Sequence, residues 1–103
     1  MKQYDLAILG GGPGGYVAAI RAAQLGLSTA IIDQDKLGGI CLNWGCIPTK
    51  ALLKNAEVLE TIKNAKNFGI NIPSYKVDFA KTIKRSRQTS ARLSKGIEFL
   101  MKK

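Results

Sequence analysis

The 103-residue sequence predicts an α/β fold in which a βαβ unit with two parallel strands precedes two long helices. Three observations predict this fold. A short apolar segment leads into a glycine-rich turn, an alanine-rich helix follows, and a second apolar segment ends at an acidic residue. Only these two segments are credible strands, and two strands do not make a stable sheet. We therefore expect an incomplete sheet, with residues 1–103 forming the N-terminal portion of a larger domain.

The first strand is predicted over Tyr4–Leu9, an apolar segment typical of a parallel strand that is buried on both faces. The glycine-rich turn Gly10–Gly15 follows and matches the pattern G-x-G-x-x-G at Gly10, Gly12 and Gly15. In this pattern the first glycine allows a tight turn and the second lets a pyrophosphate approach the backbone. The third lets the next helix pack close to the strand.

A helix is predicted over Tyr16–Leu25, ended by Gly26, and a second strand over Thr29–Ile32. Asp33 ends this strand, where an acid can accept hydrogen bonds from a ribose 2′-hydroxyl. A glycine cluster alone also fits a plain turn, but the strand, helix and acid together favour dinucleotide binding. A phosphate-loop NTPase is excluded, because no Gly-Lys-Ser/Thr follows the glycines.

The only two cysteines, Cys41 and Cys46, lie five positions apart. On a regular helix such residues differ by about 140° around the axis and face apart. A bond between them therefore requires a bent backbone, and Gly45 is the residue best able to bend. Pro48 fits the first turn of a following helix, which would put Cys46 near a helix N-terminus, where the dipole favours a thiolate. We interpret the pair as a redox-active dithiol/disulfide beside a bound redox dinucleotide.

Three other interpretations of the cysteines remain open: zinc ligands, a structural disulfide, or two buried inert thiols. The sequence has no histidine and no further cysteine to complete a metal site, so no metal is expected. It also has no secretory signal and no apolar run long enough to span a membrane. The expected location is therefore the cytoplasm, where a cysteine pair is more often catalytic than structural.

Two helices are predicted downstream, over Pro48–Lys66 and Phe79–Lys103, with Phe68–Val77 as the loop between them and Asp78 as the cap of the second. The first helix has an apolar stripe at Leu52, Leu53, Ala56, Leu59 and Ile62. The second has a seam, polar in its middle, that predicts packing against another helix: Phe79, Ile83, Ser86, Ser90, Leu93, Ile97 and Leu100.

The positive charge of the chain is concentrated in the last predicted helix. The net charge is +9, and residues 79–103 carry eight basic side chains against Glu98 alone. A basic helix can bind nucleic acid or an acidic partner. No aromatic residues are interleaved with the basic ones, so a solvated helix face is the favoured interpretation and no nucleic-acid partner is expected.

With these residues in view, the chain resembles the N-terminal part of the flavoprotein disulfide reductases, which are class I pyridine nucleotide-disulphide oxidoreductases. The resemblance covers essentially all 103 residues and is most specific over Gly38–Leu53, with support from Gly10–Ile20. It is closest to the members that oxidise dihydrolipoamide, because Leu-Asn-Trp separates the cysteines and Ala-Leu-Leu follows Lys50. Glutathione and mercuric reductases typically carry Val-Asn-Val there. The resemblance implies a Rossmann-like FAD/NAD(P)-binding fold.

The resemblance also implies roles for individual residues around a bound FAD. Cys41 would be the thiol that meets the substrate, and Cys46 would be the charge-transfer thiolate against the flavin. Lys50 would lie near the flavin N5 edge. Ile40 stands where threonine is common, so a hydroxyl contact is lost there. The full set of residues implied to bind the cofactor is Gly10, Gly12, Pro13, Gly14, Gly15, Asp33, Gln34, Lys36, Gly38, Gly39 and Lys50.

The implied reaction passes two electrons from dihydrolipoamide to the Cys41–Cys46 disulfide, then to FAD and finally to NAD. Dihydrolipoamide would be carried by a 2-oxoacid dehydrogenase or glycine cleavage complex, and the activity would contribute to cellular redox homeostasis. The family's catalytic histidine, its NAD-binding region and its homodimer interface are expected in sequence beyond residues 1–103. A sister reductase of the glutathione or mercuric type and a non-catalytic truncated fragment are the alternatives.

Overall fold

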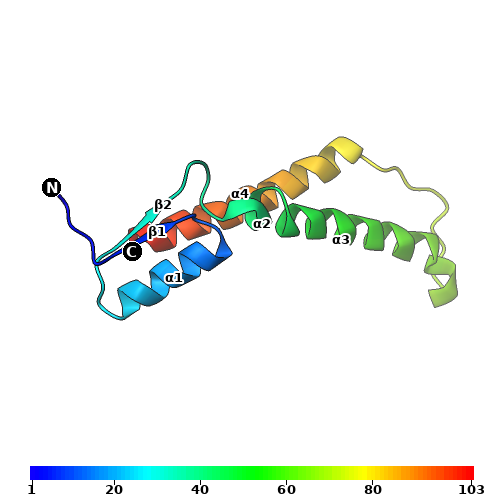
Figure 1. The fold of residues 1–103 in the computed structure, drawn as a ribbon. Helices are drawn as coiled ribbons and strands as arrows, with labels where there is room; N and C mark the ends of the chain where they lie inside the picture. Colours follow the sequence, from blue (N-terminus) through cyan, green and yellow to red (C-terminus); the bar gives the residue numbers. More distant parts are fainter.

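The computed structural model describes residues 1–103 as a βαβ unit from which two helices extend side by side (Figure 1). Strands β1 and β2 pair in parallel, with Leu6 opposite Thr29 and Leu9 opposite Ile32, so the sheet has two strands as expected. The elements in chain order are β1 (Leu6–Leu9), α1 (Pro13–Gln24), β2 (Thr29–Ile32), α2 (Gly39–Asn43), α3 (Cys46–Lys63), the 3₁₀ helix η1 (Ala65–Phe68) and α4 (Phe79–Lys102).

The molecule is elongated, because the α3–α4 pair projects far beyond the βαβ unit (Figure 1). Its principal extents are 67 × 25 × 18 Å and its radius of gyration is 19.8 Å. A compact chain of this length has a radius of gyration of roughly 13 Å. Few apolar side chains are therefore enclosed, and the buried ones are mostly small: Ala19, Ala22, Leu42, Ala51 and Ala65.

Strand β1 differs from the prediction in length and in burial. It begins at Leu6 rather than at Tyr4, and three of its four residues are exposed, including Leu9 at 87%. The expectation that both faces are buried is therefore wrong for residues 1–103. The physical reason is that only α1 and the end of α4 lie against this two-stranded sheet, which leaves apolar strand surface uncovered.

Helix α1 begins earlier than predicted, at Pro13 instead of Tyr16. Proline suits the first helical position because its fixed φ is already helical and its missing N–H would have no partner there. The end of the helix is confirmed: Leu25 is the C-cap and Gly26 has a left-handed φ of 84°. Glycine adopts this conformation without the penalty that a Cβ carries.

The connection around α3 contains two short helices that the sequence pattern did not indicate, α2 and η1. Helix α3 itself begins at Cys46, two residues before the prediction, and ends at Lys63 rather than Lys66. The predicted apolar stripe is only partly covered, because Leu53 is 62% exposed. The cap of α4 is confirmed, since the Asp78 side chain accepts a hydrogen bond from the Lys81 N–H at 3.0 Å.

Helix α4 packs through serines, two of them from the polar middle of the predicted seam, rather than through the large side chains at the ends of that seam. Ser86, Ser90 and Ser94 recur every fourth residue and are 1%, 5% and 6% exposed. In contrast, Phe79 is 69% exposed and Leu100 is 44% exposed. The predicted seam is therefore confirmed at its polar middle, where α4 packs against α2 and α3, and it is wrong at its apolar ends, which are exposed. No helix is both long enough and apolar enough to cross a membrane.

Candidate functional site

The two cysteines form a disulfide at the junction of α2 and α3. Cys41 lies in α2, Cys46 is the first residue of α3, and their Cα atoms are 4.6 Å apart. Gly45 makes the bend between the helices. A Cβ at this position would lie 3.0 Å from the Ile40 carbonyl oxygen and 3.3 Å from the Cys41 Cα. The expected bend at Gly45 is confirmed, and the lack of a side chain matters here because the two helices approach so closely.

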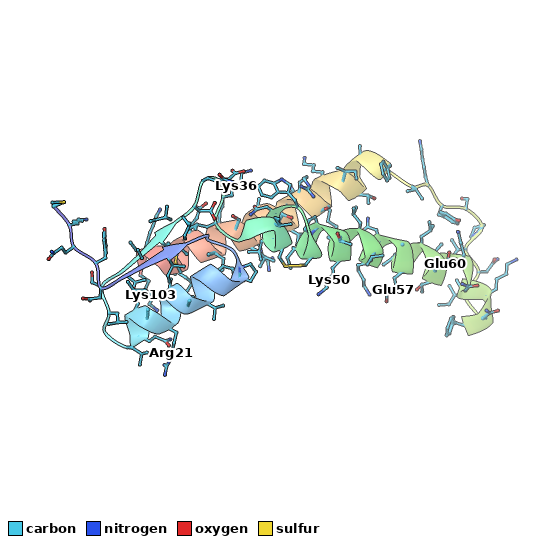
Figure 2. The ribbon with its side chains drawn as sticks, viewed as in Figure 1. Arg21, Lys36, Lys50, Glu57, Glu60 and Lys103 are labelled. Atoms are coloured by element: carbon cyan, nitrogen blue, oxygen red, sulfur yellow. A yellow bond between two sulfur atoms is a disulfide. The ribbon has the colours of Figure 1, made fainter.

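Cys46 occupies the N-terminus of an 18-residue helix. No side chain caps this end, so the partial positive charge of the helix dipole faces the first residues, and a thiolate at Cys46 would be stabilised there. Cys46 is exposed and Cys41 is half-buried. Lys50 follows Cys46 by one helical turn, and Figure 2 shows it on the same side of α3 as the sulfur–sulfur bond.

The glycine turn offers a set of backbone donors to a phosphate. Gly12 is the N-cap of α1, and no side chain caps this helix. The N–H groups of Gly12, Gly14 and Gly15 have no acceptor within the protein. Space for a ligand exists as well, because a Cβ built at Gly14 would meet nothing within 4 Å. Free amides at a helix N-terminus fit a pyrophosphate by charge and by hydrogen bonding.

Glycine is required at two points of this turn. Gly10 has a left-handed φ of 103°. A Cβ at Gly15 would collide with the Gly10 carbonyl oxygen, so only glycine lets α1 pack against the end of β1. The G-x-G-x-x-G pattern therefore forms the strand–turn–helix geometry that the sequence predicted.

Gly38 and Gly39 lie directly against the glycine turn, although more than 20 residues separate them from it in the sequence. The Gly38 N–H donates to the Gly11 carbonyl oxygen at 2.8 Å. A Cβ at Gly39 would lie only 2.7 Å from the Gly12 Cα. Because Gly39 also begins α2, which contains Cys41, the glycine turn and the disulfide belong to one continuous structure.

Asp33 directly follows β2 and accepts hydrogen bonds from backbone N–H groups of two loops. Its carboxylate accepts from the Gly11 N–H at 2.6 Å and from the Asp35 N–H at 2.8 Å. The hydrogen bond from Asp35, followed by the one from Gly11, lowers the pKa of the Asp33 carboxyl below its ordinary value. A carboxylate has about four acceptor positions, so acceptor capacity remains for a ribose hydroxyl.

A shallow pocket of about 330 Å³ lies at the carboxyl ends of both strands. It is lined by Leu9, Gly10, Ile32, Asp33 and Gln34. Ligands of open α/β sheets bind at this end of the strands. The structure thus brings Gln34 together with Gly10 and Asp33, as expected for residues that would hold the adenosine half of a dinucleotide.

Lys36 lies apart from the other residues predicted to bind a cofactor. Figure 2 shows Lys36 above the ribbon and Lys50 below it. Lys36 instead lines a pocket of about 380 Å³ together with Trp44, Arg87 and Lys95. Its side chain makes no hydrogen bond or ion pair within the protein. No group of three or more His, Cys, Asp or Glu side chains lies together as a metal site would require.

Sequence reasoning missed the polar residues that hold the loop carrying Gly38 and Gly39. The Asn43 amide is buried and donates to the carbonyl oxygens of Leu37 and Gly39 at 3.2 and 2.9 Å. The Ser94 hydroxyl donates to the same Leu37 oxygen at 2.6 Å. A signal for Ser94 existed in its four-residue spacing from Ser90, but nothing in the local pattern distinguishes Asn43 from a surface asparagine.

These features define a class of protein: an α/β fold in which a disulfide is built directly onto a glycine turn of the dinucleotide-binding type. The turn has free backbone N–H groups that could donate hydrogen bonds to a phosphate, and the strand ends form a pocket that contains Asp33. Cys41 of the disulfide lies two residues beyond Gly39, the glycine that touches the turn.

The family described as pyridine nucleotide-disulphide oxidoreductase matches residues 4–103, and the chain belongs to this family. The chain is similar to the dihydrolipoyl dehydrogenase of Rhizobium etli, with 59% identity over 99% of this chain and 21% of the relative. The dihydrolipoyl dehydrogenase of Mycobacterium bovis is 55% identical over 100% of this chain and 22% of the relative. A dihydrolipoyl dehydrogenase of Bacillus subtilis is 52% identical over 98% of this chain and 21% of the relative. The chain therefore spans about a fifth of the length of these curated relatives.

Proposed function

We propose that the chain is the N-terminal, FAD-binding part of a dihydrolipoyl dehydrogenase. The observation that carries this proposal is the direct contact between the disulfide segment and the phosphate-binding turn. Gly39 touches Gly12 at the N-terminus of α1, and Cys41 follows two residues later in α2. A disulfide linked so closely to a nucleotide site is suited to exchange electrons with that nucleotide. The identity to relatives named dihydrolipoyl dehydrogenase supports the particular substrate.

The residues present fit FAD, because the turn has unpaired amides and lacks the Cβ atoms that would fill the space. Gly12, Pro13, Gly14 and Gly15 would hold the pyrophosphate together with Gly38 and Gly39. Gly10, Asp33 and Gln34 would hold the adenosine half, and Lys50 would lie toward the flavin. FAD, when bound, supplies a two-electron acceptor beside the dithiol. Lys36 is a weaker candidate for this role because it lies over α4 instead.

The chemistry proposed for the chain's own residues is thiol–disulfide exchange. A thiolate of dihydrolipoamide attacks the Cys41 sulfur, a mixed disulfide forms, and the Cys41–Cys46 bond breaks with Cys46 leaving as a thiolate. The second substrate thiol then attacks the mixed disulfide, which releases lipoamide and leaves Cys41 reduced. Two electrons have moved from the substrate to the cysteine pair. The N-terminus of α3 stabilises the Cys46 thiolate during this exchange.

The remaining parts of the reaction are proposed to lie in a longer protein. The chain has no histidine, so a catalytic histidine would come from elsewhere, in the family pattern from the other subunit of a homodimer. NAD would accept the electrons in a second nucleotide site outside residues 1–103. The cytoplasm is the proposed location, and a 2-oxoacid dehydrogenase or glycine cleavage complex is the proposed source of dihydrolipoamide.

A chimera tests the proposal. This chain would replace the corresponding 103 residues of the Rhizobium etli relative, to which it is 59% identical. The chimera is expected to bind FAD and to form NADH from dihydrolipoamide and NAD, and Cys46→Ser in the chimera is expected to abolish this activity while FAD stays bound. Activity with glutathione or mercuric ion in place of dihydrolipoamide would assign the chain to a sister reductase. A chimera that binds no FAD contradicts the proposal.

A further inference from the structure

Helix α4 donates side-chain hydrogen bonds to backbone carbonyl oxygens all along the segment that carries the disulfide. The donors come from one helix and span three of its turns, and the acceptors lie before, between and after the cysteines. The four pairs are Ser94 to Leu37 at 2.6 Å, Arg87 to Asn43 at 3.2 Å, Ser86 to Pro48 at 3.3 Å and Arg85 to Ala51 at 3.1 Å. The only other side-chain donor to backbone carbonyls of this segment is Asn43, which lies within the segment itself and donates to Leu37 and Gly39.

Arg87 differs from the other donors in where its hydrogen bond ends. The Asn43 carbonyl is the only backbone group between Cys41 and Cys46 that accepts from a side chain. It lies at the last residue of α2, directly before the bend at Trp44 and Gly45. The Arg87 guanidinium therefore holds the end of α2 at the point where the chain turns to bring the two cysteines together.

We propose that Arg87 is a positioning residue for the Cys41–Cys46 pair, an inference that rests on the proposed redox function of that pair. Closing the disulfide oxidises both thiols: a sulfur–sulfur bond forms, and two protons and two electrons leave. With oxidised dithiothreitol as the oxidant, those electrons and protons convert it to its dithiol. The equilibrium constant for this exchange measures how well the fold holds the two sulfurs within bonding reach.

The positive charge of Arg87 offers a competing explanation, and the two explanations predict opposite signs. A nearby cation stabilises a thiolate, so loss of the charge alone would favour the disulfide. Loss of positioning instead lets the bend relax, so the thiols meet less often and the disulfide becomes easier to reduce. One net hydrogen bond corresponds to about a fivefold change in an equilibrium constant. For two electrons this change corresponds to about 20 mV toward easier reduction.

The experiment measures the equilibrium of the chain with reduced and oxidised dithiothreitol, with the fluorescence of Trp44 as the readout. Trp44 is the only tryptophan and lies between the cysteines, so its emission reports directly on the disulfide. Arg87→Met removes the donor and keeps the aliphatic stem. Arg92→Met is the matched control, because Arg92 lies on the same helix, is exposed and makes no hydrogen bond. Arg87→Gln keeps a shorter, uncharged donor.

We expect Arg87→Met to lower the equilibrium constant for disulfide formation about fivefold. Arg92→Met is expected to leave it unchanged, and Arg87→Gln to give an intermediate value, with the same far-UV circular dichroism in all variants. In denaturing urea all variants should have the same equilibrium constant for disulfide formation, because the fold no longer holds the cysteines. If Arg87→Met is unfolded, the equilibrium constant of folded Arg87→Gln is compared with that of Arg92→Met instead, and a lower constant in Arg87→Gln supports the positioning role.

Two results overturn the positioning role. The first is an equal equilibrium constant for Arg87→Met and the Arg92→Met control, which means that the hydrogen bond does not hold the pair. A raised constant in Arg87→Met means that the charge dominates. A third result concerns the proposed function itself: if the unmodified chain shows no reversible two-electron transition, the cysteines are not a redox pair. That outcome is visible before any variant is compared, so the two failures are distinguishable.

Discussion

The close approach of Gly39 to Gly12 leads to the sharpest stability prediction, for the substitution Gly39→Ala. Gly39 has a left-handed φ of 63°, and an added Cβ would lie 2.7 Å from the Gly12 Cα. The left-handed conformation costs a non-glycine residue roughly 1–2 kcal/mol. The collision adds about 1–3 kcal/mol, because the atom it meets is backbone and cannot rotate away. The free energy of unfolding should therefore fall by about 2–5 kcal/mol.

Two control substitutions separate these terms. Gly69 also has a left-handed φ, 73°, but a Cβ there meets nothing within 4 Å, so Gly69→Ala should show only the conformational cost of roughly 1–2 kcal/mol. Gly96 lies in open space within α4 with an ordinary helical φ, so Gly96→Ala should stabilise the chain by about 1 kcal/mol.

The assay is urea unfolding followed by far-UV circular dichroism and extrapolated to water. The expected order of stability is Gly96→Ala, unmodified chain, Gly69→Ala and Gly39→Ala, from highest to lowest. The decisive quantity is the difference between Gly69→Ala and Gly39→Ala. If these two variants are equally stable, the disulfide segment does not rest against the glycine turn, and the structural basis of the proposed function is lost.

Three further predictions follow from single side chains. Because hydrogen bonds lower the pKa of Asp33, the stability that its carboxylate contributes is present above the ordinary carboxyl pKa of 3.8 and is lost as the pH falls through the lowered pKa of the folded chain. Asp33→Asn should abolish this acid-induced loss of stability, which urea unfolding curves measured below pH 3.8 would show. A pH profile of stability that is the same in Asp33→Asn and in the unmodified chain would contradict the prediction. Asp78→Ala removes the cap that accepts the Lys81 N–H, so the free energy of unfolding should fall by about 1 kcal/mol in the same urea assay, with Asp78→Asn as the conservative control. Lys50→Met removes the cation one turn after Cys46, so alkylation of reduced Cys46 at neutral pH should slow about twofold, and an equal rate would exclude a role for Lys50 in stabilising the thiolate.

Sequence reasoning succeeded where the chemistry is local. The glycine turn, the second strand, the Asp78 cap and the bend at Gly45 each follow from residues within a few positions of one another, and the structure contains all four. The glycines of the turn are constrained by their own backbone, so their pattern carries its structural meaning directly.

Sequence reasoning failed where the outcome depends on what lies across the fold. The seam of α4 was predicted to pack along its whole length, but its apolar ends at Phe79 and Leu100 are 69% and 44% exposed. Serines fill the contact instead, because α2 and α3 come too close for larger side chains. The role of Asn43 also escaped prediction, because its acceptors at Leu37 and Gly39 come within reach only when the short helix α2 forms, and the sequence pattern did not indicate that helix.

The hydrogen bond from Ser94 to Leu37 spans 57 residues and joins the last helix to the loop that carries Gly38 and Gly39. Its span sets an order of events during synthesis. A growing polypeptide that has emerged only as far as η1 already contains Gly10–Gly15, Gly38, Gly39 and both cysteines, yet the Leu37 carbonyl still lacks the hydrogen bond from Ser94. We therefore expect the loop that carries Gly38 and Gly39 to reach its final form late in synthesis, once α4 has left the exit tunnel and folded back beside α1.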